Sequence, residues 1–126
     1  MKTVLIVEDD PDTRSALADV LTAEGYRAVA AEAVDQAVEY LSTEEAPCLI
    51  LLDAGLPCAS GVEVLRWLRD RGRKLPVAVM SGWHPAEKGL EGFRDHVVGV
   101  LRKPFDVNVV LELIEEQCDP SVVRSD

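Results

Sequence analysis

Short apolar runs alternate with segments of helical periodicity along the whole chain. Five runs have the length and composition of β-strands, and polar or turn-forming residues end each of them: 3–7, 27–31, 48–52, 76–80 and 97–101. Apolar residues at three- and four-residue intervals predict helices in between; these cover 12–24, 34–42, 61–71 and 107–117. The segment from Pro85 to Asp95 is a weaker helix candidate, because Gly89 and Gly92 each cost a helix about 1 kcal/mol relative to alanine.

The third apolar run, Cys48 to Leu52, does not alternate between apolar and polar residues. A strand of this kind is buried on both faces, as in a parallel sheet that helices cover from both sides. Strands that alternate with helices through short loops also indicate a parallel α/β sheet. In such sheets the ligand site lies beyond the carboxyl ends of the strands, at the switch in strand order. The residues at those ends are therefore the first candidates for function.

The predicted strand ends carry a concentrated set of polar residues. They are Glu8, Asp9 and Asp10 after the first strand, Asp53 after the third, Ser81 after the fourth and Lys103 after the fifth. Carboxylates gathered so closely need a proton, a basic partner or a metal. A few oxygen ligands with room for water favour Mg²⁺, and a carboxylate can itself be a nucleophile. The set fits phosphoryl transfer to an aspartate, in which positioning and charge stabilisation carry most of the catalysis.

Each of these residues also has an ordinary structural explanation. The acidic loop could be a solvated turn, Asp53 an N-cap, Ser81 a turn residue and Lys103 a surface charge. Their shared position at the ends of several strands makes independent coincidence the weaker explanation.

Composition narrows the choice of partners and surroundings. The chain has 126 residues, enough for one domain, and 13 Lys and Arg against 23 Asp and Glu give a net charge of −10. That acidity argues against binding of nucleic acids or anionic membranes, both of which need a positive surface. The longest apolar run is too short to span a bilayer. Three cysteines with no CxxC pair predict neither a disulfide framework nor a zinc site. We expect a soluble, cytoplasmic domain with reduced cysteines.

Four motifs in this order resemble the receiver domain of two-component response regulators. They are Val4-Leu5-Ile6-Val7-Glu8-Asp9-Asp10, Asp53-Ala54-Gly55-Leu56-Pro57 with Gly61 following, Ser81-Gly82 and Lys103-Pro104-Phe105. The resemblance covers about Thr3 to Gln117 and implies a flavodoxin-like, doubly wound sheet of five parallel strands in the order 2-1-3-4-5, the order for which the receiver CheY is a known example. It implies a receiver over residues 1–118, followed by a polar tail or linker stub over residues 119–126.

The resemblance also assigns roles by position. It implies that Asp53 is the phosphoacceptor and that Ser81 and Lys103 contact the phosphoryl group. The implied cofactor is Mg²⁺, for which Mn²⁺ can substitute, with Asp9, Asp53 and the backbone carbonyl of Gly55 as ligands and Glu8 acting through water. Asp10 is expected to be a neighbour of the site rather than a ligand, and the Lys103–Pro104 peptide bond is expected to be cis.

Three positions depart from the family pattern. Val100 stands where the family usually has an aromatic switch residue in the fifth strand, so the usual inward rotation of that aromatic ring cannot occur. Gly55 leaves one side of the acceptor open, and Trp83 is a candidate to shield it. The glycine-interrupted segment Pro85 to Asp95 makes the fourth helix of the family short or mobile by expectation.

The function that the resemblance implies is a phosphorylation-dependent signalling switch rather than an enzyme acting on an external metabolite. Its donor would be a histidine kinase or a histidine phosphotransfer protein. The alternative is a pseudo-receiver that binds partners without phosphorylation. The complete pocket disfavours it, whereas Val100 and the weak fourth helix favour it. A haloacid-dehalogenase-type phosphohydrolase needs a second aspartate two residues after its nucleophile, and Gly55 stands there instead.

The helix predicted near the carboxyl end is richer in apolar residues than one buried face requires. Val107, Val110, Leu111 and Ile114 form one stripe, and Val109 and Leu113 widen it. A broad core face and a surface for a second copy or an output partner explain this equally well. In the family such a surface is formed by the segments that correspond here to 85–95, 97–101 and 107–117.

Overall fold

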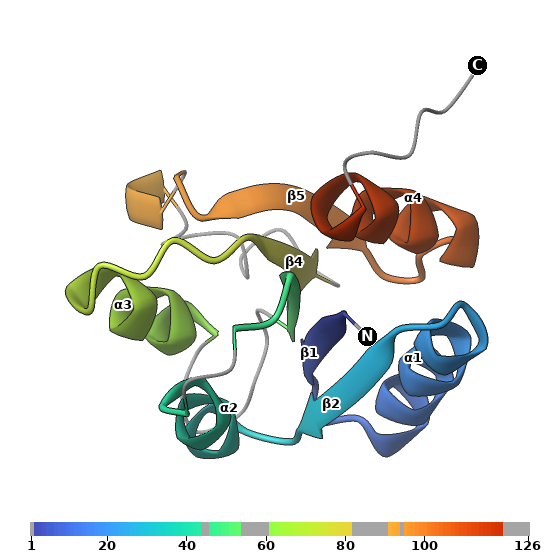
Figure 1. The fold of residues 1–126 in the computed structure, drawn as a ribbon, viewed down its shortest axis with the longest axis horizontal. Coiled ribbons are helices and arrows are strands. Elements are labelled where there is room, and N and C mark those ends of the chain that lie inside the picture. The colour runs from blue at the N-terminus through green and yellow to red at the C-terminus, as the bar shows by residue number, and fades with distance from the viewer. Residues whose placement is uncertain (1, 44–45, 54–60, 82–90, 94, 120–126) are drawn as a thin grey trace.

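The computed structural model describes residues 2–43, 46–53, 61–81, 91–93 and 95–119 (Figure 1). Its strands are β1 (Thr3–Val7), β2 (Arg27–Ala31), β3 (Leu49–Asp53), β4 (Val77–Ser81) and β5 (Val97–Arg102). Its helices are α1 (Pro11–Ala23), α2 (Val34–Leu41), α3 (Val62–Asp70) and α4 (Val107–Cys118), and a 3₁₀ turn η2 covers Glu91–Phe93. Every strand and every helix with full periodicity therefore lies within a residue of its predicted bounds.

The five strands form one parallel sheet in the order β2-β1-β3-β4-β5, which confirms the flavodoxin-like order. The register aligns their carboxyl ends. Val7 pairs with both Ala31 and Leu52, and Asp53 pairs with Met80. Residues that follow these pairs therefore leave the sheet at a common edge, which we call the carboxyl edge.

Helices cover both faces of the sheet, so there are two hydrophobic cores rather than one (Figure 1). Helices α2 and α3 pack on one face through Ala37, Leu41, Val64, Leu65 and Leu68. Helices α1 and α4 pack on the other through Leu17, Leu21, Val110, Ile114 and Cys118. All residues of β3 and β4 are buried, as the unbroken apolar run at 48–52 predicts.

Short polar signals set the ends of the helices. Asp10 is the N-cap of α1, where its carboxylate accepts a hydrogen bond of 3.1 Å from the backbone N–H of Thr13. Asp106 caps α4 in the same way and accepts a hydrogen bond from the N–H of Asn108 at 2.8 Å. Gly25 follows α1 with a φ of 88°, a conformation that side chains with a Cβ rarely adopt. The loop after β1 and the loop after β5 thus each end in an aspartate that caps the following helix.

The cysteines correct one expectation. Cys48 and Cys118 form a disulfide across a sequence separation of 70, with Cα atoms 5.1 Å apart. The expectation that the cysteines are reduced is therefore wrong for this structure. Spacing along the sequence could not reveal the pair, because it is the sheet order that brings the start of β3 beside the end of α4. Cys58 lies outside the described residues.

The last helix buries one narrow face, not the whole predicted stripe. Val110, Ile114 and Cys118 are buried, whereas Val107 and Val109 are exposed. Only 91–93 and Asp95 of the weak helix candidate at 85–95 are described, and 91–93 form a single 3₁₀ turn. Among the described residues, no helix is both long enough and apolar enough to cross a bilayer.

Candidate functional site

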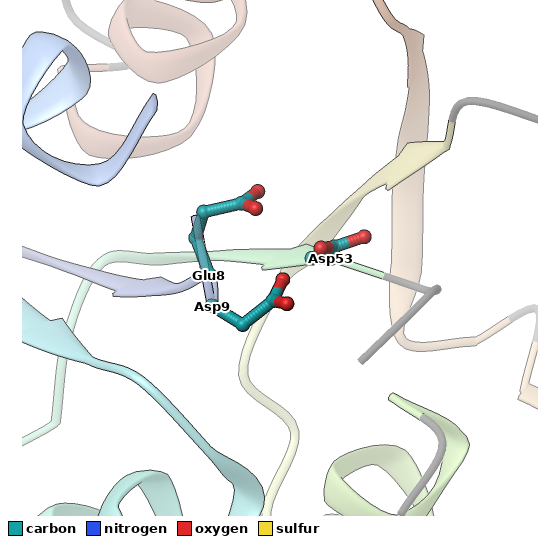
Figure 2. Close-up of side chains that lie close together, drawn as sticks. All are labelled: Glu8, Asp9 and Asp53. Atoms are coloured by element: carbon teal, nitrogen blue, oxygen red, sulfur yellow. The ribbon is translucent and has the colours of Figure 1, made fainter. Parts of the chain in front are cut away.

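Three carboxylates meet at the carboxyl edge. Glu8 and Asp9 directly follow β1, and Asp53 is the last residue of β3. Their side chains point toward a common space (Figure 2), and one oxygen from each lies within 4.8 Å of the others. Glu8 and Asp53 are buried, whereas Asp9 is exposed. The cluster is therefore closed toward the sheet and open toward solvent, and its oxygen donors fit a hard divalent cation that keeps water ligands.

Lys103 provides a positive charge at this cluster. Its Nζ donates a hydrogen bond of 2.8 Å to Glu8 Oε2 and lies 3.5 Å from Asp53 Oδ2. Lys103 follows β5 directly, and its backbone N–H donates to the carbonyl of Ser81 at 2.8 Å. The Lys103–Pro104 peptide bond is cis, as expected. One ammonium group thus connects the ends of β1, β3 and β5.

The Glu8 carboxylate is held on both oxygens. Oε1 accepts a hydrogen bond of 3.2 Å from the N–H of Asp10, while Oε2 accepts from Lys103. The residue is only 1% exposed. Burial raises the pKa of Glu8 and the negative charge of Asp53 raises it further, whereas the hydrogen bond from Lys103 lowers it without cancelling these effects. Glu8 is therefore a carboxylate whose charge is costly unless a cation is near.

The same pairing acts on Lys103 in the opposite sense. Burial by itself would lower the pKa of Lys103, but the hydrogen bond to Glu8 and the charge of Asp53 outweigh it, and the pKa is raised. Lys103 therefore stays protonated at neutral pH. A fixed ammonium group beside a carboxylate nucleophile can bind an incoming anionic oxygen as a point charge.

The remaining predicted residues are divided between the described and the undescribed parts of the chain. Ser81 is the last residue of β4 and is buried at the same edge. Asp10 caps α1 instead of joining the acidic cluster, in keeping with its expected role as a neighbour. Gly55 and Trp83 lie outside the described residues.

Arg14 is a residue that the sequence did not single out. It lies in the first turns of α1, and its guanidinium donates to the backbone carbonyls of Glu8 at 3.0 Å and Asp9 at 3.4 Å. Arg14 therefore holds the backbone of the acidic loop. The sequence signal for this role was the N-cap Asp10. It fixes the start of the helix one turn before Arg14 and so places the Arg14 side chain beside the acidic loop.

A groove of about 310 Å³ lies beside the site, between α1 and α4. Ala16 and Val20 line it from α1, Val107 from α4, and Lys103 and Phe105 from the loop that joins β5 to α4. Its walls are largely apolar. Because Lys103 is one of the lining residues, the groove borders the carboxylate cluster. The groove therefore places apolar side chains next to the carboxylate cluster.

The outer strand β5 is exposed on one side. Val98 and Val100 are 39% and 44% exposed, and the alternation along β5 buries Leu101 on the opposite face. Val107 and Val109 of α4 are exposed as well, and we call these four residues the exposed valines. Val100, at the position of the usual aromatic switch, therefore faces outward.

The sequence matches the response regulator receiver domain family over residues 4–115. It is 33% identical over 111 residues to the response regulator protein FleR of Pseudomonas aeruginosa, covering 88% of this chain and 23% of FleR. It is also 33% identical over 106 residues to the phosphate regulon transcriptional regulatory protein PhoB of Escherichia coli, covering 82% of this chain and 46% of PhoB. The chain thus spans a quarter to a half of the length of these relatives.

Solved structures agree with the sequence comparison. A response regulator receiver protein from Pseudomonas putida has a TM-score of 0.83 at 31% identity, with 91% of this chain and 96% of that chain covered. The response regulator TrrA from Thermotoga maritima, in complex with Mg²⁺-BeF, has a TM-score of 0.79 at 24% identity, with 93% and 99% covered. The chain therefore belongs to the response regulator receiver domains, the family of signalling switches of two-component systems.

Proposed function

We propose that this receiver accepts a phosphoryl group on Asp53 in a Mg²⁺-dependent reaction and signals through the resulting change in conformation. The observation that carries the proposal is the position of the Asp53 carboxylate, 3.5 Å from the Lys103 ammonium and within the cluster formed with Glu8 and Asp9. An attacking carboxylate, a fixed cation and an open cation site are the parts that phosphoryl transfer to an aspartate requires.

In the proposed reaction an Asp53 oxygen attacks the phosphorus of a phosphohistidine. A P–O bond forms, the P–N bond breaks, and the electron pair leaves with the histidine nitrogen. Lys103 then holds one phosphoryl oxygen, and Ser81, at the end of β4, donates a hydrogen bond to another. The protein promotes its own phosphorylation and the later hydrolysis of the aspartyl phosphate, and it turns over no external metabolite.

Mg²⁺ is the proposed cofactor, and Mn²⁺ can replace it. Asp9, Asp53 and the backbone carbonyl of Gly55 would hold the ion, with Glu8 acting through water. When bound, the ion supplies positive charge that offsets the repulsion between the carboxylates and the incoming phosphoryl group. The donor set of the described residues supports this assignment, as does the Mg²⁺-BeF complex of the similarly folded TrrA.

The proposed donor is a histidine kinase or a histidine phosphotransfer protein. Its proposed binding site is the groove between α1 and α4. The groove is apolar and ends at Lys103, so a helical partner lying in it would bring a phosphohistidine to Asp53. We place the domain in the cytoplasm with these partners. Its net charge of −10 argues against direct contact with nucleic acid or an anionic membrane, so any DNA-binding output would come from another domain.

We propose that β5 and α4, which carry the exposed valines, present the output surface for a second copy of the domain or an output partner. The side chains of these valines are apolar and exposed, and β5 is an edge strand of the sheet. Since Val100 is not aromatic, we propose that phosphorylation reaches this surface through Lys103 and the loop to α4 rather than through ring rotation.

The test is the intact mass of the protein after incubation with a small phosphodonor and Mg²⁺. We expect the gain of one phosphoryl group, its loss on chelation and its loss in Asp53→Asn. Asp106→Asn is the matched control, because asparagine also caps helices and should leave the gain unchanged. If the folded, Mg²⁺-loaded protein gains nothing from either the small donor or a phosphorylated histidine phosphotransfer protein, the phosphorylation-independent pseudo-receiver replaces this proposal.

A further inference from the structure

The amino edge of the sheet, opposite the proposed phosphoacceptor, carries the Cys48–Cys118 disulfide. Cys48 immediately precedes β3, and Cys118 is the last residue of α4. We propose that this pair is a reversible thiol–disulfide clamp, in which oxidation fastens the end of α4 to the start of β3 and reduction releases it. The proposal does not depend on phosphorylation of Asp53.

The surroundings hold the two cysteines close even without the covalent bond. Lys2 Nζ donates to the backbone carbonyl of Cys118 and forms an ion pair of 2.9 Å with Asp119. The Tyr26 hydroxyl donates to the other carboxylate oxygen of Asp119 at 3.0 Å. Both contacts anchor the last turn of α4 to the segments that precede β1 and β2. The reduced thiols therefore stay positioned to form the bond again.

The two cysteine residues differ in exposure. Cys118 is 2% exposed, whereas Cys48 is only partly buried and its sulfur lies 3.3 Å from the carbonyl of Thr3. Thiol–disulfide exchange needs an approach to one sulfur along the bond that breaks. The structure assigns Cys48 as the residue that meets the external reagent and Cys118 as the residue that closes the bond.

The oxidant is a low-molecular-weight disulfide such as glutathione disulfide. The Cys48 thiolate attacks one sulfur of the oxidant, forming a mixed disulfide and releasing one glutathione. The Cys118 thiolate then attacks the Cys48 sulfur and releases the second. Two protein thiols lose two electrons and two protons, and one glutathione disulfide becomes two thiols. In a reducing compartment disulfides are mostly transient or redox-sensing, so the open form is the resting state there.

The clamp acts on a helix that links two functional regions. Helix α4 begins shortly after Lys103 and carries Val107 and Val109, two of the exposed valines. Its buried face, including Val110 and Ile114, packs on the core formed with β3 and α1. A covalent bond at its far end limits opening of the last turns. Oxidation therefore makes α4 stiffer, and reduction leaves it to its noncovalent contacts.

The first experiment equilibrates the full chain in glutathione buffers of graded redox ratio, traps free thiols with an alkylating reagent and maps the linked peptides. We expect a Cys48–Cys118 link that forms and disappears reversibly over the series. Cys58→Ser is the matched control and should behave as the wild type, whereas Cys48→Ser should form no such link. A link that persists in excess reduced glutathione would make the bond purely structural, and glutathione adducts in place of the link would overturn the pair.

The second experiment is amide hydrogen exchange of the same samples, which reports local opening. We expect exchange in the last two turns of α4 to slow by about tenfold or more on oxidation, because opening of that end is then restrained. Cys48→Ser should show no response to oxidant; if it fails to fold, Cys118→Ala takes its place. Equal exchange in oxidised and reduced wild type would overturn the clamp even if the link forms.

Discussion

The two edges of the sheet use polar groups in opposite ways. Among the described residues of the carboxyl edge, the carboxylates of Glu8, Asp9 and Asp53 outnumber the one nearby ammonium group, that of Lys103. At the amino edge, Asp119 accepts from both Lys2 and Tyr26 beside a disulfide, so charge is paired and the chain is tied. This difference fits the proposal that the carboxyl edge receives a cation and a phosphoryl group while the amino edge holds the fold together.

Loss of the amino-edge disulfide should have the largest effect on stability. The closed loop spans a sequence separation of 70, for which the chain-entropy argument gives up to about 4 kcal/mol. We expect oxidised wild type to exceed Cys48→Ser by an amount of this order in urea denaturation, and reductant to erase the difference. An equal free energy of unfolding in the two oxidised proteins would show that this edge is held by its noncovalent contacts alone.

Removal of the Lys103 ammonium group should have the largest effect on the rate of phosphorylation. In Lys103→Met the phosphoryl oxygen loses its positive partner, and the rate of phosphorylation by a small donor should fall by about 100-fold. The measurement is the time course of intact mass with saturating Mg²⁺. Lys74→Met, which removes an exposed lysine, is the control and should keep the wild-type rate of phosphorylation. A wild-type rate in Lys103→Met would show that the Lys103 ammonium group has no part in the transfer.

Asp9→Asn should relieve repulsion among the three carboxylates. Without metal we expect the variant to be more stable than the wild type by about 1 kcal/mol, because like charges in a shared site destabilise each other. With Mg²⁺ the order should reverse, because only the wild type gains stability from binding. Thermal unfolding with and without Mg²⁺ measures both effects. Asp19→Asn, on the exposed side of α1, should respond to Mg²⁺ as the wild type does.

Acid titration should give small effects of opposite sign at the two edges. The folded pKa of Glu8 is raised above 4.5, so wild type loses stability as pH rises from 4.5 through that pKa, and Glu8→Gln gains relative to it in metal-free buffer. The folded pKa of Asp119 is lowered below 3.8, chiefly by its hydrogen bond to Lys2.

The contribution of Asp119 to stability is therefore complete above pH 3.8 and lost as pH falls through the folded pKa. The stability deficit of Asp119→Asn should shrink over that range. Urea denaturation of the three proteins at a series of pH values gives both slopes. Slopes of the same sign would contradict the difference between the edges.

The carboxyl edge could be read from the sequence far better than the amino edge. Asp53 follows its apolar run directly and Lys103 follows its run after one residue, so strand periodicity places both at one edge once the sheet is known to be parallel. Cys48 and Cys118 belong to different elements with no common motif, and only the packing of α4 on β3 brings them together. The hydrogen bond between Lys103 and Glu8 and the role of Arg14 could not be predicted for a similar reason, because the directions of these side chains depend on the loop conformations.

Locating the phosphoryl group along the chain tests whether Asp53 is the acceptor. An aspartyl phosphate is reduced by borohydride to homoserine, which tandem mass spectrometry of the digested protein can place. We predict homoserine at position 53 alone, only in samples that received both phosphodonor and Mg²⁺. Homoserine at another acidic position, or none in a sample whose intact mass had increased by a phosphoryl group, would contradict the account.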